Sequence, residues 1–240
     1  MIAAVDAPDA WYLKGGLAPA AVVTALAGRA FVAVRRTGKL LLLDTSGGGP
    51  VLGLRFGMSG RLLVDGRAGV DRLLYSSERD LRVWDRFGVR FADGGSLVVR
   101  DPRRLGGVSL DPPEAALGPD ALALTAGGLR AVLDSAAPLK ARLLDQTRLA
   151  GVGNLVADEV LWRAALDPRR PARSLTAPEA RRLHRHLRAT LPDLIARGGS
   201  HTGDLMAARR PGGSCPRDGA LLERATVGGR TTWWCPFHQR

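Results

Sequence analysis

The chain has 240 residues, a formal net charge of +12 and 45% hydrophobic residues. This hydrophobic content excludes a globally disordered chain, and the length suits one large domain or two modest domains with a small appendage. No apolar run is long enough to span a bilayer, and the first residues, MIAAVDAPDAW, contain neither a basic start nor an apolar stretch. We therefore expect a cytoplasmic protein without a membrane partner, and we expect it to be a monomer.

Arginine carries most of the positive charge, and it is concentrated in the C-terminal part of the chain. Between Arg169 and Arg240 there are 14 arginines and only 5 acidic residues. A basic region of this kind favours a polyphosphate partner, because each neutralised phosphate releases condensed counterions. The alternative is a solubilising surface. Nucleic acid is the favoured partner because the acidic residues are not evenly interspersed.

The first hundred residues are predicted to form β-strands. Short segments rich in Val and Leu are separated by glycines that mark turns, a pattern typical of an antiparallel sandwich or barrel. The predicted strands are residues 31–36, 39–44, 51–56, 61–66, 87–92 and 96–101.

The pattern changes to helix after residue 110. Helices are predicted over residues 125–133, 138–146, 154–165 and 176–197, and the last begins with a capping box in which Thr176 is the N-cap and Glu179 follows three residues later. The Gly- and Arg-rich segment 200–214 is predicted to be a linker. The fold class is therefore α+β, with an antiparallel β-sandwich over 1–110, a helical domain over 111–199 and a C-terminal hairpin over 215–240.

The link TRLAGVG between two predicted helices is a candidate anion site. Gly151 and Gly153 allow a tight turn, and Asn154 is a good N-cap for the helix that follows. Exposed N–H groups and the positive end of the helix dipole favour an anion there, and a DNA phosphate suits the charge of the chain. An ordinary helix–helix corner explains the same residues, and the spacing alone does not decide between the two.

Two cysteines 20 residues apart in a cytosolic protein indicate a metal site more than a disulfide. The segments ALLERATV and TTWWC are predicted to pair across Gly228 and Gly229, as in a zinc ribbon. We expect Zn²⁺ in this hairpin, and the alternative is a hairpin without metal that is held by Trp233, Trp234 and Phe237. The candidate ligands, in the spacing C-x2-D-x16-C-x2-H, are Cys215, Asp218, Cys235 and His238.

The string LKARLLDQTRLAGVGNLVADEVLWRA, followed by DPRRPARSLT, resembles the helix–two-turn–helix region of the formamidopyrimidine-DNA glycosylase and endonuclease VIII family. The segments GRAFVAVRRTGKLLLLD, LRFGMSGRLLV and VVRDPRRLGG stand in the order that this family has. The resemblance implies a DNA-repair protein of the bifunctional DNA glycosylase/AP lyase class that flips and excises oxidised or abasic lesions. Its expected partner is damaged double-stranded DNA, and its expected place is the nucleoid.

The resemblance also assigns roles to residues. Met58, Arg103 and Leu105 are implied to fill the space left by a flipped base. Arg230 is implied to grip a phosphate, and Glu159 matches a family glutamate that we expect to make buried hydrogen bonds. The remaining residues expected to contact DNA are Lys39, Arg104, Lys140, Gly153 and Asn154. The family has four cysteines at the metal positions, two of which are Asp218 and His238 here.

The chain departs from the family pattern at its expected nucleophile, an N-terminal proline followed by glutamate. We expect that the family's first helix is absent from this sequence, and Pro8 is no substitute because its nitrogen is an internal amide. A lysine that the family has in its β-sheet is also missing, since Val83 and Trp84 stand where lysine and histidine are expected.

Two alternatives therefore stay open: a non-catalytic module that binds damaged DNA, and a zinc-ribbon protein of RNA or the ribosome. A base-release assay separates the enzyme from the non-catalytic module. Competition between damaged duplex and structured RNA tests the third hypothesis.

Overall fold

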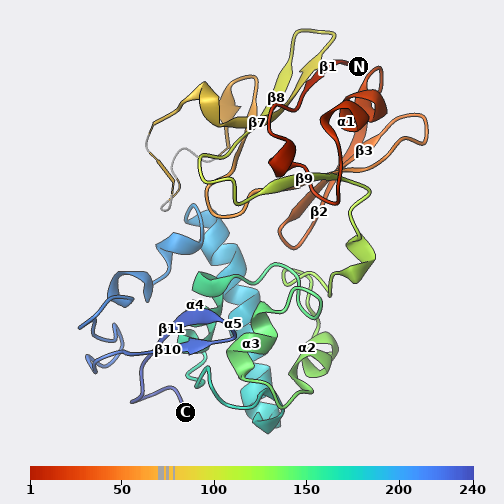
Figure 1. Ribbon diagram of the computed structural model, residues 1–240. Coiled ribbons are helices and arrows are strands. Elements are labelled where there is room, and N and C mark those ends of the chain that lie inside the picture. Colours follow the sequence, from red (N-terminus) through yellow and green to blue (C-terminus); the bar gives the residue numbers. More distant parts are fainter. Residues whose placement is uncertain (70–72, 74–75, 78) are drawn as a thin grey trace. The chain divides into compact units, whose positions relative to one another are not determined.

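The computed structural model describes residues 1–69, 73, 76–77 and 79–240, and the chain divides into two compact units, Met1–Glu114 and Ala115–Arg240 (Figure 1). The first unit is built mainly from strands and the second mainly from helices. Within the described residues, no helix combines the length and the apolar character needed to cross a bilayer.

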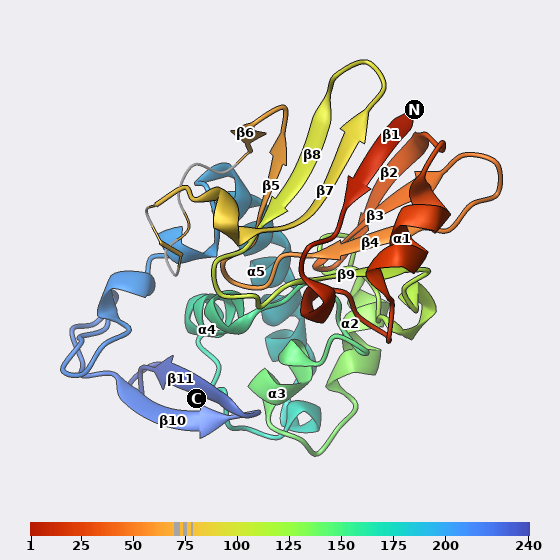
Figure 2. The same cartoon turned by 45° about the horizontal axis from the view of Figure 1, so that its top comes forward.

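The first unit contains two antiparallel sheets, which confirms the predicted β-sandwich (Figure 2). The five-stranded sheet has the order β1 (Ile2–Asp6), β7 (Asp85–Phe91), β8 (Ser96–Arg100), β5 (Arg61–Val64) and β6 (Arg67–Ala68). The four-stranded sheet has the order β2 (Phe31–Thr37), β3 (Leu40–Thr45), β4 (Leu52–Arg55) and β9 (Gly107–Leu110).

Both sheets contribute to one hydrophobic core. Phe87 and Val99 come from the five-stranded sheet, Leu54 and Val108 come from the four-stranded sheet, and all four side chains are buried in the same cluster. Burial of apolar surface between two sheets is what stabilises a sandwich. All six predicted strands are present within a few residues of their expected bounds.

The sequence prediction missed helix α1 (Pro19–Leu26) and strands β1, β6 and β9. Helix α1 has Pro19 in its first turn and buries Val22 and Leu26. Its N-cap is Ala18, which offers no side-chain acceptor, and its paired valines suit a strand as well as a helix. The first unit also has short 3-10 turns, which are η1 (Ala10–Tyr12), η2 (Arg82–Trp84) and η3 (Glu114–Ala116, at the boundary of the two units).

The second unit confirms the four predicted helices. They are α2 (Ala126–Leu133), α3 (Leu139–Leu144), α4 (Asn154–Arg163) and α5 (Ala177–Ala196). Their core is formed by aliphatic side chains such as Leu143, Val160 and Leu187, each fully buried. Strands β10 (Glu223–Val227) and β11 (Arg230–Trp234) pair across Gly228 and Gly229, as predicted.

Residues 200–214 are packed within the second unit, although we expected them to be a linker. The segment contains the 3-10 turns η5 (Ser200–Thr202) and η6 (Met206–Ala208), and a third short turn, η4 (Ala172–Ser174), precedes α5. Leu205 is fully buried in a cluster with Trp162 and Trp233. A glycine- and arginine-rich composition suggested flexibility, but one buried leucine and its backbone hydrogen bonds order the segment. Residues 115–240 form one compact unit. The finer division into a helical domain, a linker and a C-terminal hairpin stays a prediction.

The predicted capping box at the start of α5 is present. The Thr176 hydroxyl accepts a hydrogen bond from the Glu179 N–H, and the Glu179 carboxylate accepts one from the Thr176 N–H at 2.8 Å. Arg170 donates to the same carboxylate at 2.7 Å. The hydrogen bond from Arg170, together with those from Thr176, lowers the pKa of Glu179 from its ordinary 4.5 to about 2.

We predict that Glu179→Gln lowers the free energy of unfolding by about 1 kcal/mol at pH 7. Because the folded-state pKa is depressed, the stabilisation is fully present above pH 4.5 and is lost as the pH falls toward 2. The difference between variant and wild type, measured by urea unfolding at stepped pH, should therefore shrink on acidification. Glu223→Gln is the control, since Glu223 is half exposed and lies 3.9 Å from Arg169, and it should give little difference at any pH.

Candidate nucleic-acid interface and metal centre

A buried carboxylate organises the two loops of the first unit that carry the expected lesion-contacting residues. Asp101 is completely buried and accepts hydrogen bonds from the Ser59 hydroxyl at 2.5 Å, the Gly106 N–H at 2.8 Å and the Tyr12 hydroxyl at 3.2 Å. Burial, reinforced by the Asp101 charge, raises the pKa of Tyr12 above its usual range, so the phenol stays a donor. One carboxylate therefore fixes both the 57–60 loop and the 101–106 loop.

The two loops approach each other so closely that glycine is required at their contact. A Cβ atom on Gly57 would lie 2.7 Å from the backbone carbonyl carbon of Leu105, and one on Gly106 would lie 2.2 Å from the Arg55 oxygen. Gly57 also has a φ of +60°, which other residues rarely adopt. Next to this contact Met58 is 51% exposed and Leu105 is 45% exposed, so two apolar side chains project from a rigid base.

The basic residues of this region lie in two places. Arg36, Lys39 and Arg55 line a groove of about 500 Å³ together with Leu105. Arg104 pairs instead with Asp9 at 2.5 Å. The Pro8–Asp9 segment, which we rejected as a substitute for the family's nucleophile, contributes an ion pair through Asp9.

Arg103 donates its backbone N–H to Asp101 at 3.2 Å, and it lies between Asp101 and the exposed Leu105 on the same loop. Val83 and Trp84, which stand where a lysine and a histidine were expected, form the end of η2 just before β7. The structure therefore gathers Met58, Leu105 and the arginines beside them on one loop pair.

In the second unit, an amide side chain shapes the link between α3 and α4. Gln146 donates its side-chain N–H groups to the carbonyls of Leu144 and Val152, and its side-chain oxygen accepts the N–H of Gly151. Gly151 has a φ of +110°. The link is thus a fixed turn in which Gln146, a residue we did not predict, supplies the missing backbone partners.

Asn154 is not the N-cap of α4, contrary to our expectation. Gly153 is the N-cap, and no side chain caps the helix. The Asn154 amide instead donates to the Thr231 carbonyl on β11 at 3.1 Å. The side chain therefore fastens the hairpin, and the first N–H groups of α4 are left without a side-chain cap.

Lys140 is buried, and its contacts differ from the DNA contact that we expected. Its ammonium lies 2.7 Å from the Asp158 carboxylate and donates to the Thr231 carbonyl and the Thr232 hydroxyl. Burial lowers the pKa of Lys140, and the neighbouring Asp158 charge opposes that shift. Arg209 binds the other oxygen of Asp158 at 2.7 Å. Lys140 therefore has a structural role in attaching β11.

Glu159 is buried, 2% exposed, on another face of α4. Its carboxylate accepts the backbone N–H groups of Asp204 and Leu205 at 3.0 Å each and pairs with Arg163 at 2.7 Å. A Cβ atom on Gly203 would lie 2.6 Å from Glu159 Oε2, so the segment can approach only with glycine there. These contacts give Glu159 a structural role in ordering residues 203–205.

The hairpin tip lies against α3. A Cβ atom on Gly228 would lie 2.9 Å from the Ala141 Cα atom, and Gly228 and Gly229 both have positive φ angles. Arg230, the first residue of β11, is exposed beside this turn. The tip therefore presents an arginine from a tightly packed backbone.

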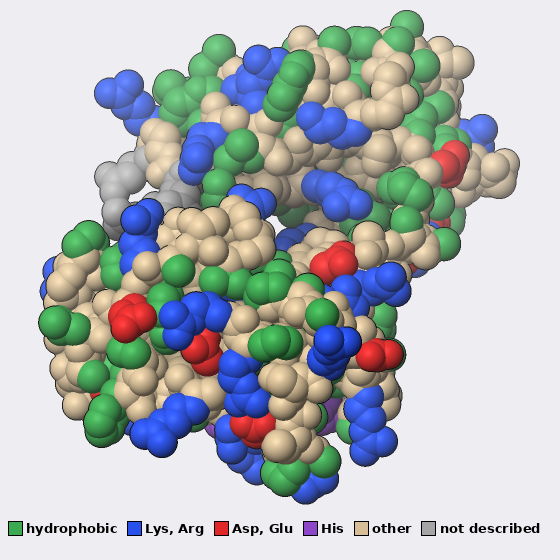
Figure 3. All heavy atoms as spheres, turned by 60° about the horizontal axis from the view of Figure 1, so that its bottom comes forward, with side chains coloured by type: hydrophobic (Ala, Val, Ile, Leu, Met, Phe, Trp, Pro, Cys, Tyr) green, Lys and Arg blue, Asp and Glu red, His purple; other side chains and the backbone are tan. Residues whose placement is uncertain are grey.

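Figure 3 shows one face of the molecule, over which Lys and Arg side chains are spread with fewer Asp and Glu side chains.

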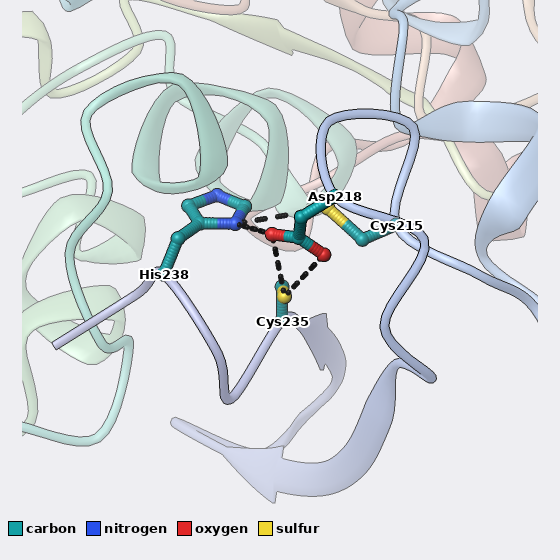
Figure 4. Close-up of side chains that lie close together, drawn as sticks. All are labelled: Cys215, Asp218, Cys235 and His238. Atoms are coloured by element: carbon teal, nitrogen blue, oxygen red, sulfur yellow. Dashed lines mark hydrogen bonds and ion pairs between the residues drawn. The ribbon is translucent and has the colours of Figure 1, made fainter.

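The four candidate metal ligands come together at the base of the hairpin (Figure 4). Their donor atoms all lie within 4.8 Å of one another. Cys215 Sγ is 3.7 Å from His238 Nδ1, Cys235 Sγ is 3.3 Å from Asp218 Oδ2, and His238 Nδ1 is 2.5 Å from that same oxygen.

The two distances that involve sulfur fit a metal ion, whereas the 2.5 Å between His238 and Asp218 is that of a direct ion pair and would lengthen around a cation. A tetrahedral zinc ion with bonds of roughly 2.0–2.3 Å holds its donors about 3–4 Å apart, and thiolate, imidazole and carboxylate are all competent ligands. Burial raises the pKa of Cys235 to about 11, a cost that a bound cation would offset. In the alternative without metal, Trp233 and Trp234 are buried as that alternative requires, but Phe237 is 65% exposed and cannot hold the hairpin.

Comparison with known proteins agrees with this arrangement. Residues 1–108 match the formamidopyrimidine-DNA glycosylase N-terminal domain, and residues 117–205 match the formamidopyrimidine-DNA glycosylase H2TH domain. The formamidopyrimidine-DNA glycosylase of Paracoccus denitrificans is 37% identical over 250 residues, which cover 92% of this chain and 87% of the relative. That of Thermus thermophilus is 38% identical over 245 residues, which cover 90% and 85%.

The solved structures of similar fold include Lactococcus lactis formamidopyrimidine-DNA glycosylase. One is bound non-covalently to DNA that contains an AP site, and another is bound to DNA that contains FAPY-dG. Each matches with a TM-score of 0.78 and 25% identity, over 100% of this chain and 92% of the other. With both domain patterns matched across most of its length, this chain belongs to the formamidopyrimidine-DNA glycosylase family.

Proposed function

We propose that this chain acts in DNA repair, by binding damaged double-stranded DNA, turning the damaged nucleotide out of the stack and excising its base. The observation that carries the proposal is the attachment of the hairpin tip, with its exposed Arg230, to the N-terminal end of α4. A guanidinium and the uncapped N–H groups of a helix terminus are two donor sets that suit the phosphates of a DNA backbone.

The loops of the first unit supply the second part of the proposed activity. A flipped nucleotide leaves a gap in the stack, which apolar side chains can fill and a guanidinium can stabilise. Met58 and Leu105 project from the loop pair that Asp101 holds, and Arg103 lies on the same loop. Lys39 lines the adjacent groove and adds positive charge near these side chains. A non-catalytic damage sensor is less well supported, because the relatives that match most of the chain are glycosylases.

The Cys215, Asp218, Cys235 and His238 cluster is proposed to bind Zn²⁺ as a structural ion. Bound zinc would supply folding free energy at the base of the hairpin. The backbone pairing of β10 with β11 fixes the register of the hairpin and places Arg230 at its tip.

We predict that the chain binds duplex DNA with an affinity that falls steeply as salt rises, and that Arg230→Ala weakens binding by about 1–3 kcal/mol. The loss should be similar for different sequences, and the slope of log affinity against log salt should decrease by about 1. Fluorescence anisotropy at several salt concentrations measures both quantities. The matched control is Arg181→Ala on α5, another exposed arginine. Salt-independent binding, or equal losses in the two variants, would contradict the proposed phosphate contact.

We predict that Met58→Ala reduces the preference for a duplex with an abasic site over an intact duplex more than it reduces total affinity. A side chain that enters the stack matters only where a base has left it. Paired anisotropy titrations with the two duplexes give the ratio of affinities. Val64→Ala is the control, because Val64 is equally exposed on β5 of the same unit. Equal losses on both duplexes would show that Met58 makes no lesion-specific contact.

We predict about one zinc ion per chain in protein that is purified without added metal. Cys235→Ser should lose the ion because it removes a buried donor, and a chelator should lower DNA affinity because the hairpin then no longer fixes Arg230. Elemental analysis and anisotropy are the measurements. If wild-type protein contains no transition metal and the chelator has no effect, the hairpin is stabilised by its own packing.

A further inference from the structure

One tryptophan of α4 contacts two of the four candidate metal ligands. Trp162 is 7% exposed, and its indole Nε1–H donates to Cys215 Sγ at 3.2 Å. Its backbone carbonyl lies 3.3 Å from His238 Nε2, and its ring meets the imidazole edge to face, with centroids 6.2 Å apart. The Arg217 guanidinium covers the ring, 5.1 Å from its centroid.

These contacts distinguish the two nitrogens of His238. Nδ1 faces the other donors, at 3.7 Å from Cys215 Sγ and 2.5 Å from Asp218 Oδ2. Nε2 faces the Trp162 carbonyl, which can only accept a hydrogen bond. A neutral imidazole carries one N–H. When Nδ1 and the Asp218 oxygen both face a bound cation, that N–H is on Nε2, where the Trp162 carbonyl accepts it.

The indole acts on the sulfur. A thiolate ligand carries negative charge, and a hydrogen bond from a neutral N–H stabilises that charge where it is buried. The Arg217 backbone N–H donates to the same sulfur at 3.4 Å. Because Cys215 is 3% exposed, water has little access to supply these hydrogen bonds instead.

Trp162 also continues a row of residues along α4. Asn154, Asp158 and Trp162 are spaced four residues apart, so they lie along one side of the helix. Asn154 holds the Thr231 carbonyl and Asp158 accepts the Trp233 N–H at 3.4 Å. Helix α4 therefore contacts β11 at Thr231 and at Trp233, and Trp162 contacts the ligand cluster at the base of the hairpin.

We infer that Trp162 is a positioning residue of the metal centre, which sets the Nδ1 ligation of His238 and stabilises the Cys215 thiolate. This inference rests on the proposed metal binding by Cys215, Asp218, Cys235 and His238. It adds that the ligands are oriented by α4, the helix whose N-terminus is proposed to bind phosphate.

The test uses Co²⁺ as a spectroscopic probe in the full chain, with Trp162→Phe compared with Trp234→Phe. Both variants keep an aromatic ring, but the Trp234 indole N–H has no hydrogen-bond partner among the described residues, so its loss removes none. We expect Trp162→Phe to lower Co²⁺ affinity by roughly 10-fold or more, measured by chelator competition. The sulfur-to-cobalt charge-transfer band should move to lower energy, because a thiolate without its hydrogen bond gives up an electron more readily. Trp234→Phe should keep the wild-type spectrum.

A second measurement needs no variant that must fold. In ¹⁵N-labelled wild-type protein with bound ¹¹³Cd²⁺, one indole N–H should show a scalar coupling to the metal through its hydrogen bond to a ligand sulfur. We expect that resonance to be the one of Trp162. Absence of any such coupling, or a Trp162→Phe spectrum and affinity equal to those of Trp234→Phe, overturns the inference while the metal site stands. If wild-type protein binds neither Co²⁺ nor Cd²⁺, the proposed metal site and the inference fail together.

Discussion

The second unit depends on one buried charge. The Asp158 side chain is fully buried, and its two oxygens are taken by Lys140 at 2.7 Å and Arg209 at 2.7 Å. Desolvation of a carboxylate costs several kcal/mol, which only well-placed partners offset, so the loss of either cation would leave a charge that the interior cannot solvate. Asp158 lies on α4 and joins three other parts of the unit. Its carboxylate contacts Lys140 of α3, Arg209 after η6 and the Trp233 N–H of β11. The direction of the hairpin, and with it the position of Arg230, follows from that junction.

Much of the fold could be predicted from the sequence, for identifiable reasons. Runs such as KLLLLD and SLVVRD between glycines have the composition of strands, and the T-A-P-E capping box fixed the start of α5 at Ala177. Helix α1 was missed because Ala18 gives no cap signal and its valines fit either structure. The packing of residues 200–214 was also missed. The contact between Gly203 and Glu159 joins residues far apart in the chain, and no local pattern encodes it.

The residues of the candidate site were likewise predicted only in part from the sequence. The metal ligands were predicted because cysteine spacing is a local signal, and the hairpin brings them together. Lys140 and Asn154 were expected at DNA because the family resemblance assigns them there. In the structure both side chains donate to the Thr231 carbonyl, and a DNA contact of either residue stays a prediction. Asp101, Gln146 and Trp162 were not predicted at all. The Asp–Pro pair at 101–102 signals a turn, yet nothing near it shows that the carboxylate binds Tyr12 and Ser59.

The Asp101 hub has a consequence for how the first unit folds. Its hydrogen bonds reach Ser59 across 42 residues and Tyr12 across 89 residues, whereas the β10–β11 hairpin closes over a two-residue turn. Closing long loops costs more chain entropy, and contacts of large sequence separation form slowly. The hairpin can therefore close early. The loops that carry Met58 and Leu105 reach their final shape only when the first and last thirds of the sandwich have joined, so the surface proposed to meet a lesion is among the last parts of the unit to become ordered.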